Sequence, residues 1–245
     1  MTMNDTLCKQ LALDFCLSED EIRDKKNHVS VFVPRDGRRR FADGDDAFKV
    51  AVVTGKLIAT GRKDVIDALG DTLLEANGSW FFDGTTICRL NAKLADFGLA
   101  VAEAHPFYIA DKCKPVDVGE YSIVMFDRDG IERFRGDDRF DEAFAFREFA
   151  PDVLGVAAVR NGVILGMAGA SADSDRMWQI GINVLPGNEG QGIGTALVSV
   201  LRNRVLTEGR LPFYGTAMSH LASQRVAMKS GFVPAWAELY AKKIL

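Results

Sequence analysis

The sequence concentrates glycine in one short stretch, at Gly187, Gly190, Gly192 and Gly194. An alternating apolar run, Trp178 to Val184, precedes the stretch, and an apolar-periodic segment follows it. Glycine tolerates positive φ and lets a ligand approach the backbone. The first N–H groups of a helix have no partner inside the helix. A strand, a glycine-rich turn and a helix in this order therefore predict a site where backbone amides hold a phosphate group.

Two better-known phosphate-binding patterns fit this chain poorly. A dinucleotide fingerprint read from Gly190 needs a glycine at position 195, which is Thr195, and its strands should be parallel rather than joined as hairpins. The Gly55-Lys56 pair is no P-loop, because Val50 stands where a glycine is needed and no Ser or Thr follows the lysine.

The elements around the glycine stretch are readable from their periodicity. Asn161-Gly162 between two apolar runs predicts a hairpin of strands 153–159 and 163–168. A third strand, 177–184, leads into the glycines, and a helix follows until about Gly209. The rest is predicted as strand 211–216, helix 219–230 ending at Gly231, and strands 232–239 and 240–244, the last two forming a hairpin.

This order of elements, over residues 153–245, resembles the GNAT superfamily of acyl-CoA-dependent N-acyltransferases. The family signature is Arg or Gln, two residues, Gly, one residue, then Gly or Ala, and Glu189, Gly192 and Gly194 stand at the matching positions. Ser223 to Phe232 is also similar to a common family ending, Ser-x-x-Val-Ala-x-Lys-x-Gly-Phe. Glu189 departs from the expected Arg or Gln, which removes one side-chain donor.

The resemblance implies acetyl-CoA as co-substrate and an amine as acceptor. The strand before the glycine loop would hold the pantetheine and thioester through backbone groups, and the loop amides would hold the pyrophosphate. The cofactor-binding residues implied in this way are Ile182, Asn183, Val184, Glu189, Gly190, Gln191, Gly192, Ile193, Gly194 and Thr195.

The resemblance also implies direct attack of the amine on the thioester, with no covalent enzyme intermediate. The tyrosine that often protonates the leaving thiolate is replaced by Ala227, so the candidate catalytic residues are His220 and Ser223. His220 is as well explained as a residue near a helix N-terminus, and Ser223 as a first-turn serine bonded to backbone. Tyr214 is expected mainly to pack in the core. A non-catalytic acyl-CoA-binding or regulatory module is the alternative function.

Further polar residues have simple structural explanations beside functional ones. Gln179, Asp173 and Asp175 could face the substrate, although turn chemistry accounts for the two aspartates. Trp178 is expected in the core. Arg38 to Arg40 are expected to alternate faces on an exposed strand rather than to meet an anionic ligand.

The N-terminal half resembles no family, but its elements can be predicted. We expect helix over 1–26, in which Ser18 to Glu21 cap a second helical turn. We further expect a hairpin over 29–41, strands 48–53 and 57–60, helix 63–76, a short aromatic strand or turn at 80–82, and helix 86–104 ending at His105-Pro106. Residues 122–126 are predicted as strand and 139–149 as helix. The polar segment 111–120 suggests two domains, 1–115 and 116–245.

The fold class expected from these elements is α/β, of the α+β kind. The C-terminal region is a GNAT-like mixed, mostly antiparallel sheet flanked by helices, and a smaller α+β region precedes it. The length of 245 residues allows one large domain or two small ones.

Composition excludes several classes of function. A net charge of −4 gives no overall basic footprint for nucleic acid. No apolar segment approaches membrane-spanning length, and the N-terminus does not read as a signal peptide. The four cysteines form no CxxC pair and lie at no metal-ligand spacing with histidine, so we expect reduced thiols, no metal and a cytoplasmic location. The acceptor and the oligomeric state, a homodimer among the options, are not readable.

Overall fold

The computed structural model describes residues 3–40 and 46–244. It contains two compact units, one formed by Met1–Phe107 with Ala235–Leu245 and the other by Tyr108–Pro234. Residues 1–2 of the predicted first helix and residue 41 of the predicted hairpin lie outside the described residues. The domain boundaries 1–115 and 116–245 stay a prediction.

The first unit is built on a sheet with strand order β1-β3-β2-β10-β4. β2 and β3 form the predicted antiparallel hairpin, and β10 pairs antiparallel with the other side of β2. The strands are β1 (His28–Val31), β2 (Phe48–Val53), β3 (Lys56–Gly61), β4 (Leu99–Ile109) and β10 (Val233–Lys243).

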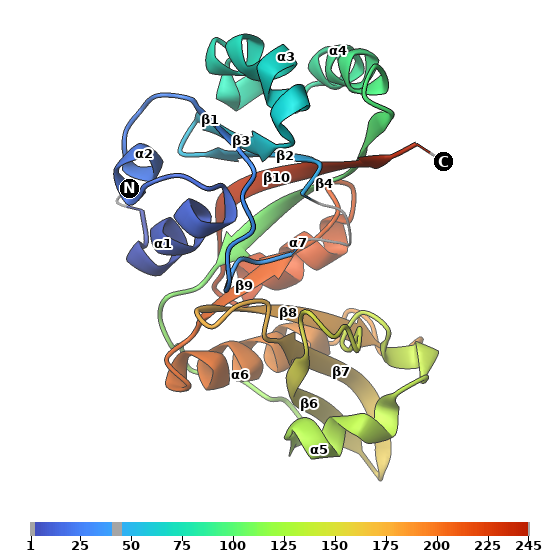
Figure 1. Cartoon of the computed structure of the whole chain (residues 1–245). Coiled ribbons are helices and arrows are strands. Elements are labelled where there is room, and N and C mark those ends of the chain that lie inside the picture. Colours follow the sequence, from blue (N-terminus) through green and yellow to red (C-terminus); the bar gives the residue numbers. More distant parts are fainter. Residues whose placement is uncertain (1–2, 41–45, 245) are drawn as a thin grey trace. The chain divides into compact units, whose positions relative to one another are not determined.

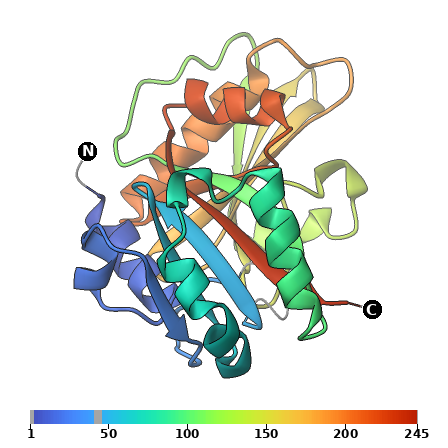
Figure 2. The same cartoon turned by 90° about the horizontal axis from the view of Figure 1, so that it is seen from above.

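Helices cover both faces of this sheet (Figures 1 and 2). α3 (Lys63–Leu74) and α4 (Gly84–Ala95), joined through the 3-10 turn η1 (Gly78–Trp80), pack their apolar stripes on one face. α1 (Asp5–Asp14) and the short α2 (Glu19–Arg23) lie on the other face. The core on the α3–α4 side includes Phe48, Val50, Leu57, Val65, Leu69, Leu94 and Leu239.

Charged side chains, rather than apolar ones alone, tie the second face of this sheet together. Arg39 donates from its backbone N–H and from Nε to the two carboxylate oxygens of buried Asp14, at 2.7 Å each. Its Nη2 lies 3.5 Å from Glu238 Oε2, an oxygen that also accepts from Trp236 Nε1 at 3.0 Å. Lys49 approaches the other Glu238 oxygen at 4.0 Å. Buried charges of this kind must be paired, because an unpaired one is costly to desolvate.

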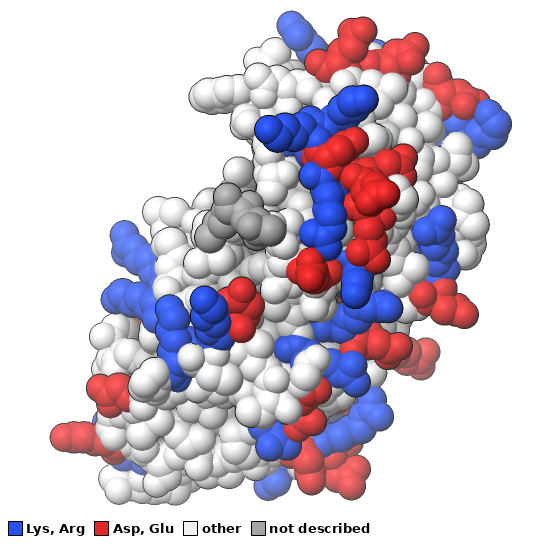
Figure 3. Space-filling model, turned by 90° about the vertical axis from the view of Figure 1, so that its left-hand side faces the viewer, with Lys and Arg blue, Asp and Glu red and all other residues white. Residues whose placement is uncertain are grey.

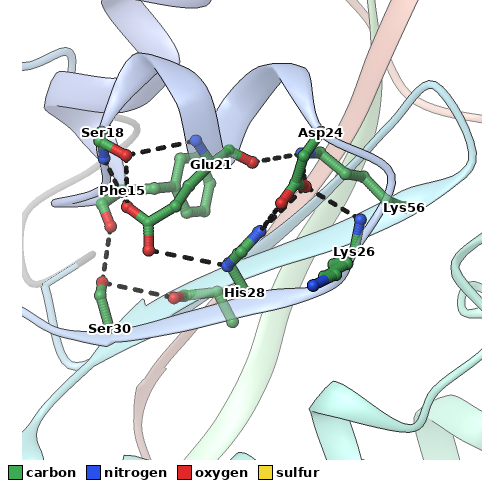
Figure 4. Close-up of polar contacts among 9 residues, drawn as sticks. Phe15, Ser18, Glu21, Asp24, Lys26, His28, Ser30 and Lys56 are labelled. Atoms are coloured by element: carbon green, nitrogen blue, oxygen red, sulfur yellow. Dashed lines mark hydrogen bonds and ion pairs between the residues drawn. The ribbon is translucent and has the colours of Figure 1, made fainter.

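A second polar cluster holds α2 against the sheet (Figure 4). Ser18 and Glu21 form a capping box, in which the Ser18 hydroxyl accepts from the Glu21 N–H and the Glu21 carboxylate accepts from the Ser18 N–H. His28 Nε2 lies 2.9 Å from both oxygens of Asp24, and Lys56 Nζ lies 3.1 Å from Asp24 Oδ1. The cluster therefore joins α2 to the adjacent strands β1 and β3.

Three predictions for the first unit are wrong. The hairpin over 29–41 does not form, because β1 instead pairs in parallel with β3. The described residues 38–40 are not in a strand, and Arg39 is buried rather than on an exposed edge. The helix predicted over 86–104 ends at Ala95. Gly98, at φ +68°, precedes β4, which begins at Leu99, so His105 lies inside a strand.

The second unit has a mostly antiparallel sheet with strand order β9-β8-β7-β6-β5. Asn161 and Gly162 take positive φ, at +53° and +77°, and make the predicted tight turn between β6 and β7. β7 and β8 pair antiparallel, while β8 and β9 pair in parallel. The strands are β5 (Ser122–Phe126), β6 (Asp152–Arg160), β7 (Val163–Ser171), β8 (Met177–Val184) and β9 (Leu211–Gly215).

Two layers sandwich this second sheet (Figure 1). α6 (Ile193–Thr207) and α7 (Leu221–Lys229) pack on one face, around a core that includes Val156, Ala168, Ile180, Leu197 and Tyr214. The other face is covered by α5 (Arg128–Ile131), η2 (Glu132–Phe134), η3 (Asp138–Phe140) and the following residues, with Phe134, Phe140 and Phe144 in the core.

Two predictions for the C-terminal region are also wrong. The helix predicted over 139–149 is a short 3-10 turn followed by irregular chain, although the segment is fully described. The hairpin predicted over 232–244 is one continuous strand, β10, which crosses to the sheet of the first unit and pairs there with β2. The sequence has no Gly, Asn or Pro between the two predicted strands, so it contains no turn signal for a hairpin there.

Surface charge is mixed in sign. On the face drawn in Figure 3, Lys and Arg side chains are interspersed with Asp and Glu side chains among the described residues. No helix within the described ranges is long and apolar enough to cross a membrane.

Candidate functional site

The glycine-rich loop has the backbone that its sequence predicts. Gly187, Gly190 and Gly192 take φ of +84°, +75° and +81°. Gly192 is the N-cap of α6, with no side-chain cap, and a Cβ at Gly190 or Gly192 would meet only open space. The amides of residues 190–195 donate to no other residue in the described part of the chain. The loop therefore presents free backbone donors at a helix N-terminus.

Two side chains of the loop fold back onto it. Glu189 Oε2 accepts a hydrogen bond from the Gly187 N–H at 2.8 Å. Gln191 Nε2 donates to the Gly187 carbonyl at 3.3 Å. Glu189 thus places a carboxylate beside the free amides, which is unfavourable for an anion bound there.

Strands β8 and β9 separate next to this loop. Their parallel register pairs Met177 with Leu211 and ends at Gln179 with Phe213. β8 nevertheless continues to Val184, and β9 to Gly215. The second half of β8 therefore borders a split in the sheet rather than a bonded neighbour.

The alternation of a β-ladder decides which groups of β8 face this split. The Leu185 N–H donates to the Leu165 carbonyl, so residues of that parity turn their backbone groups toward β7. Asn183 has the same parity and pairs with Met167 on β7. The backbone N–H and C=O of Ile182 and Val184 then point toward the β9 side, where a ligand could use them.

Three elements meet at Gly194. A Cβ on this glycine would lie 3.3 Å from Val184, 3.8 Å from Ile182 and 3.5 Å from Val226. The N-terminal turn of α6, the free half of β8 and α7 are therefore in contact. Thr195 on the same turn accepts from Ser230 Oγ at 3.1 Å through its carbonyl, and Ile193 is buried in the core.

The candidate catalytic residues lie at the start of α7. His220 is exposed and is the N-cap residue, without a side-chain cap. The Ser223 hydroxyl lies 2.8 Å from the hydroxyl of Tyr214 on β9, and this pairing replaces the bond to backbone that a first-turn serine usually makes. Ala227 is fully buried in the core. Tyr214 packs there as predicted, 2% exposed, yet it keeps a polar partner.

Asn183 uses its side chain to hold the chain on the opposite face of the sheet. Its Oδ1 accepts from the N–H groups of Glu142 and Ala143, at 3.1 and 2.7 Å, and its Nδ2 donates to Asp141 Oδ1 at 2.9 Å. A Cβ on Gly181 would lie 1.8 Å from the Glu142 carbonyl oxygen, so only glycine fits beneath this segment. This anchoring explains why the expected helix over 139–149 does not form.

The anchoring brings a carboxylate to the site. Burial raises the pKa of Tyr214; the hydrogen bond with Ser223 lowers it, and the negative charge of Glu142 raises it further. Glu142 is exposed and acts on Tyr214 electrostatically. Tyr214 is therefore a neutral hydroxyl at physiological pH, with a hydroxyl partner and a carboxylate in electrostatic range.

Sequence reasoning missed Glu142 and the Tyr214–Ser223 pair. Glu142 lies within the segment 139–149, predicted as a helix, and its position depends on Asn183, which is distant in sequence. The two aspartates assigned to turn chemistry behave so in part: Asp173 accepts from Ser171 Oγ at 2.8 Å and from the Gln179 N–H at 3.3 Å. No group of three or more metal-ligating side chains occurs among the described residues.

A strand split beside a helix N-terminus with free amides suits an extended ligand that ends in phosphate groups. Residues 122–232 match the Acetyltransferase (GNAT) family. This part of the chain therefore belongs to the GNAT family, a family of acyltransferases. The match confirms the resemblance seen in the sequence, and the structure itself shows the mixed α+β fold class.

Solved structures of similar proteins include three of this family. A GCN5-related N-acetyltransferase-like protein from Streptococcus suis is 15% identical in sequence. The alignment covers 83% of this chain and 88% of that protein, with a TM-score of 0.47. A GCN5-related N-acetyltransferase from Kribbella flavida is 16% identical, with 63% of each chain covered and a TM-score of 0.46. An acetyltransferase of the GNAT family from Colwellia psychrerythraea is 17% identical, covers 63% of this chain and 62% of its own, and has a TM-score of 0.43. No curated protein matches the sequence significantly.

Proposed function

We propose that the unit Tyr108–Pro234 transfers an acetyl group from acetyl-CoA to an amine. The observation that carries this proposal is the split between β8 and β9, which opens beside the unpartnered amides at the start of α6. A cofactor with an extended arm and a pyrophosphate needs both features, because the arm can add to a free strand edge while the amides bind phosphate oxygens.

Different residues would bind different parts of the cofactor. Amides of residues 190–195 bind the pyrophosphate, and the backbone groups of Ile182 and Val184 bind the pantetheine arm. An N–H of the free half of β8 polarises the thioester carbonyl. Asn183 acts from the other side, by holding Glu142 against the sheet.

The chemistry is direct attack by a neutral amine on the polarised carbonyl, with loss of the CoA thiolate. The Tyr214 hydroxyl, held by Ser223, is the proton donor to that thiolate. It takes the role of the tyrosine that other family members have at the position of Ala227. Glu142 attracts the protonated acceptor and takes the proton that the amine must lose. His220, exposed beside Ser223, is the second candidate for this proton transfer.

The binding part of the proposal is tested with two glycines of matched backbone. Gly192 and Gly209 lie at the two ends of α6, have φ of +81° and +72°, and face open space. Valine at either position has the same backbone strain, so both variants should lose similar stability. Calorimetric titration should show CoA affinity reduced at least about tenfold in Gly192→Val only, the loss of about 1.4 kcal/mol. Equal affinities in both variants would contradict the phosphate-binding role of the loop.

The catalytic part is tested by turnover. Protein, acetyl-CoA and a panel of amines should release free thiol, and Tyr214→Phe should lower kcat by about 100-fold with little change in KM, the scale of lost general-acid catalysis. Ser223→Ala should have a smaller effect in the same direction, and His220→Ala should lower kcat if His220 moves a proton. An unchanged kcat in Tyr214→Phe would remove Tyr214 from the mechanism.

A second function, a non-catalytic acyl-CoA-binding or regulatory module, rests on Glu189 and Ala227, which both depart from the family pattern. It predicts tight CoA binding with no thiol release across a broad amine panel. Absence of CoA binding in calorimetry would contradict both functions.

The compartment and partners are part of the same proposal. All four cysteines are free thiols, two of them exposed, which suits a reducing cytoplasm. The partners are acetyl-CoA and an amine-bearing acceptor.

A further inference from the structure

The first unit contains a pocket that the acyltransfer site does not use. It has a volume of about 620 Å³ and lies between α3, η1 and α4. Small-molecule sites in proteins have volumes of about 300–1,000 Å³ and are mostly apolar with a few placed polar groups. The pocket is within this range.

Its apolar base comes from matching helical stripes. α3 contributes Leu69 and Leu73, and α4 contributes Leu90, and all three line the pocket and are buried. One polar residue on each helix, Thr72 and Lys93, meets across the groove, where Lys93 Nζ donates to Thr72 Oγ1 at 3.1 Å.

Trp80 forms part of the wall in an unusual state. The side chain lines the pocket but leaves 70% of its surface in water. A tryptophan loses a large hydrophobic stabilisation when it is exposed, of the order of 25 cal/mol for each Å² of apolar surface. A ligand lying against the indole would recover that stabilisation.

Two cations one helical turn apart border the same pocket. Arg89 and Lys93 both line it from α4. Within the described residues, Arg89 has no ion pair. The Asp83 carboxylate also lines the pocket. It caps α4 by accepting from the Thr86 N–H at 2.8 Å and the Thr86 hydroxyl at 3.0 Å, and these bonds, together with the charge of Arg89, lower its pKa.

We propose that this pocket is a binding site for a small amphipathic organic anion. Its apolar body would lie on Leu69, Leu73 and Leu90 and against Trp80, and its carboxylate or phosphate would bind Arg89. A guanidinium recognises either head group through paired hydrogen bonds. The proposal does not depend on acyltransfer, because every lining residue belongs to the first unit.

The test uses three probes of one chain length and the whole protein. Octanoate and octyl phosphate carry the two anionic head groups, and 1-octanol is the neutral control. Tryptophan fluorescence and calorimetric titration should show saturable binding, with 1-octanol about tenfold weaker than the better anion. The ratio of the two anions identifies the head group.

Variants assign the binding to this pocket. Arg89→Gln should reduce anion affinity about tenfold and leave 1-octanol unchanged, the scale of one charge-assisted hydrogen bond. Arg62→Gln, at the N-cap of α3 and outside the pocket, is the matched control and should bind like the unmodified protein. Ala92→Trp fills the pocket from an exposed position and should abolish binding of all three probes, with an unchanged circular dichroism spectrum.

Either of two results overturns the proposal. One is the absence of saturable binding of both anions by the unmodified protein, which would leave the pocket to a protein partner or to solvent. The other is equal anion binding by the Arg89→Gln and Arg62→Gln variants, which would show that the Arg89 guanidinium does not bind the anionic head group. Acetyl-CoA turnover is measured in the same samples and should be unchanged in Arg89→Gln, so failure of this site is distinguishable from failure of the acyltransferase.

Discussion

Glu189 places a negative charge on a loop whose free amides are suited to an anion. Its carboxylate is bonded to the Gly187 N–H and thus is held in the loop rather than directed away from it. The GNAT signature has Arg or Gln at this position, where the side chain adds a donor instead of a repulsive charge. Affinity for the cofactor is therefore expected to be below what the loop could provide.

Glu189→Gln should tighten CoA binding by about threefold to tenfold. The amide keeps the acceptor for Gly187 and removes a repulsion of the order of 1 kcal/mol. Glu208→Gln, at the other end of α6, is the control and should leave the dissociation constant unchanged. Weaker binding by Glu189→Gln would mean that the carboxylate itself contributes to the site.

Asp152 gives the stability of the protein a pH dependence opposite to that of most acidic groups. Burial raises its pKa, although its carboxylate accepts from the Phe146 N–H at 2.7 Å. A folded-state pKa above the unfolded value means that this group stabilises the fold fully below about pH 3.9, the unfolded pKa of Asp. The contribution is lost as pH rises through the folded-state value.

Asp152→Asn should therefore raise the free energy of unfolding at pH 7 and converge with the unmodified protein near pH 3. Urea unfolding at several pH values measures the difference. Parallel curves for Asp152→Asn and the unmodified protein would contradict the argument.

Asp24 supplies the opposite case. A hydrogen bond from the Lys26 backbone, then His28 and Lys56, lowers its pKa, so Asp24→Asn should destabilise at neutral pH and lose that effect as pH falls.

At the scale of elements, the chain around Glu142 and Ala143 packs directly on the strand pair β7–β8. Gly169 and Gly181 are directly opposite in the ladder, and a Cβ on either would lie within 2 Å of the backbone of Ala143 or Glu142. Packing this close requires two residues without a side chain. Asn183, two residues further on, supplies the hydrogen bonds that regular helix would otherwise supply to this segment.

Gly181→Ala should cost about 1–3 kcal/mol of stability, because the methyl group would lie 1.8 Å from the Glu142 carbonyl and the segment must move. Displacement of Glu142 should also lower kcat. Gly84→Ala, where a Cβ meets nothing within 4 Å and φ is not positive, is the control and should be nearly neutral. Urea unfolding and acetyl-CoA turnover measure the two effects, and full activity of Gly181→Ala would argue against a role for Glu142.

At the scale of the whole molecule, the C-terminal strand β10 belongs to the unit that contains the N-terminal residues. Ala235–Leu245 joins residues 1–107, and β10 lies between β2 and β4 in that sheet. Glu238 on this strand also carries the ion pair with Arg39. The first unit is therefore incomplete until the end of the chain is present.

Deletion of residues 235–245 should remove the amide protection of β2 and expose the first unit to proteolysis. The cause is loss of a central strand and of the partner of buried Arg39, for which several kcal/mol is typical. Deletion of residue 245 alone, which leaves β10 and the bond from the Ile244 N–H to the Gly98 carbonyl in place, is the control and should have no effect. Hydrogen exchange and limited proteolysis measure both, and intact protection of β2 after the longer deletion would show that the strand is dispensable.

Local patterns determined the frame of the acyltransfer domain. The Asn161-Gly162 turn, the alternation in β8, the glycine loop with the stripe of α6, and the Gly231 end of α7 all have short-range causes, and each is found in the structure. The family resemblance depended on the same residues. The backbone amides proposed for the cofactor follow from them without knowledge of any distant contact.

Only the tertiary structure decided which side chains converge. Asn183 and Glu142, Tyr214 and Ser223, and Arg39 with Asp14 and Glu238 are pairs or sets separated in sequence. The same contacts prevented a helix at 139–149, and strand pairing across the first unit made β10 one strand. Local periodicity reports which surface of a segment is apolar, whereas these choices depend on partners that satisfy buried polar groups, and those partners are brought near only by folding.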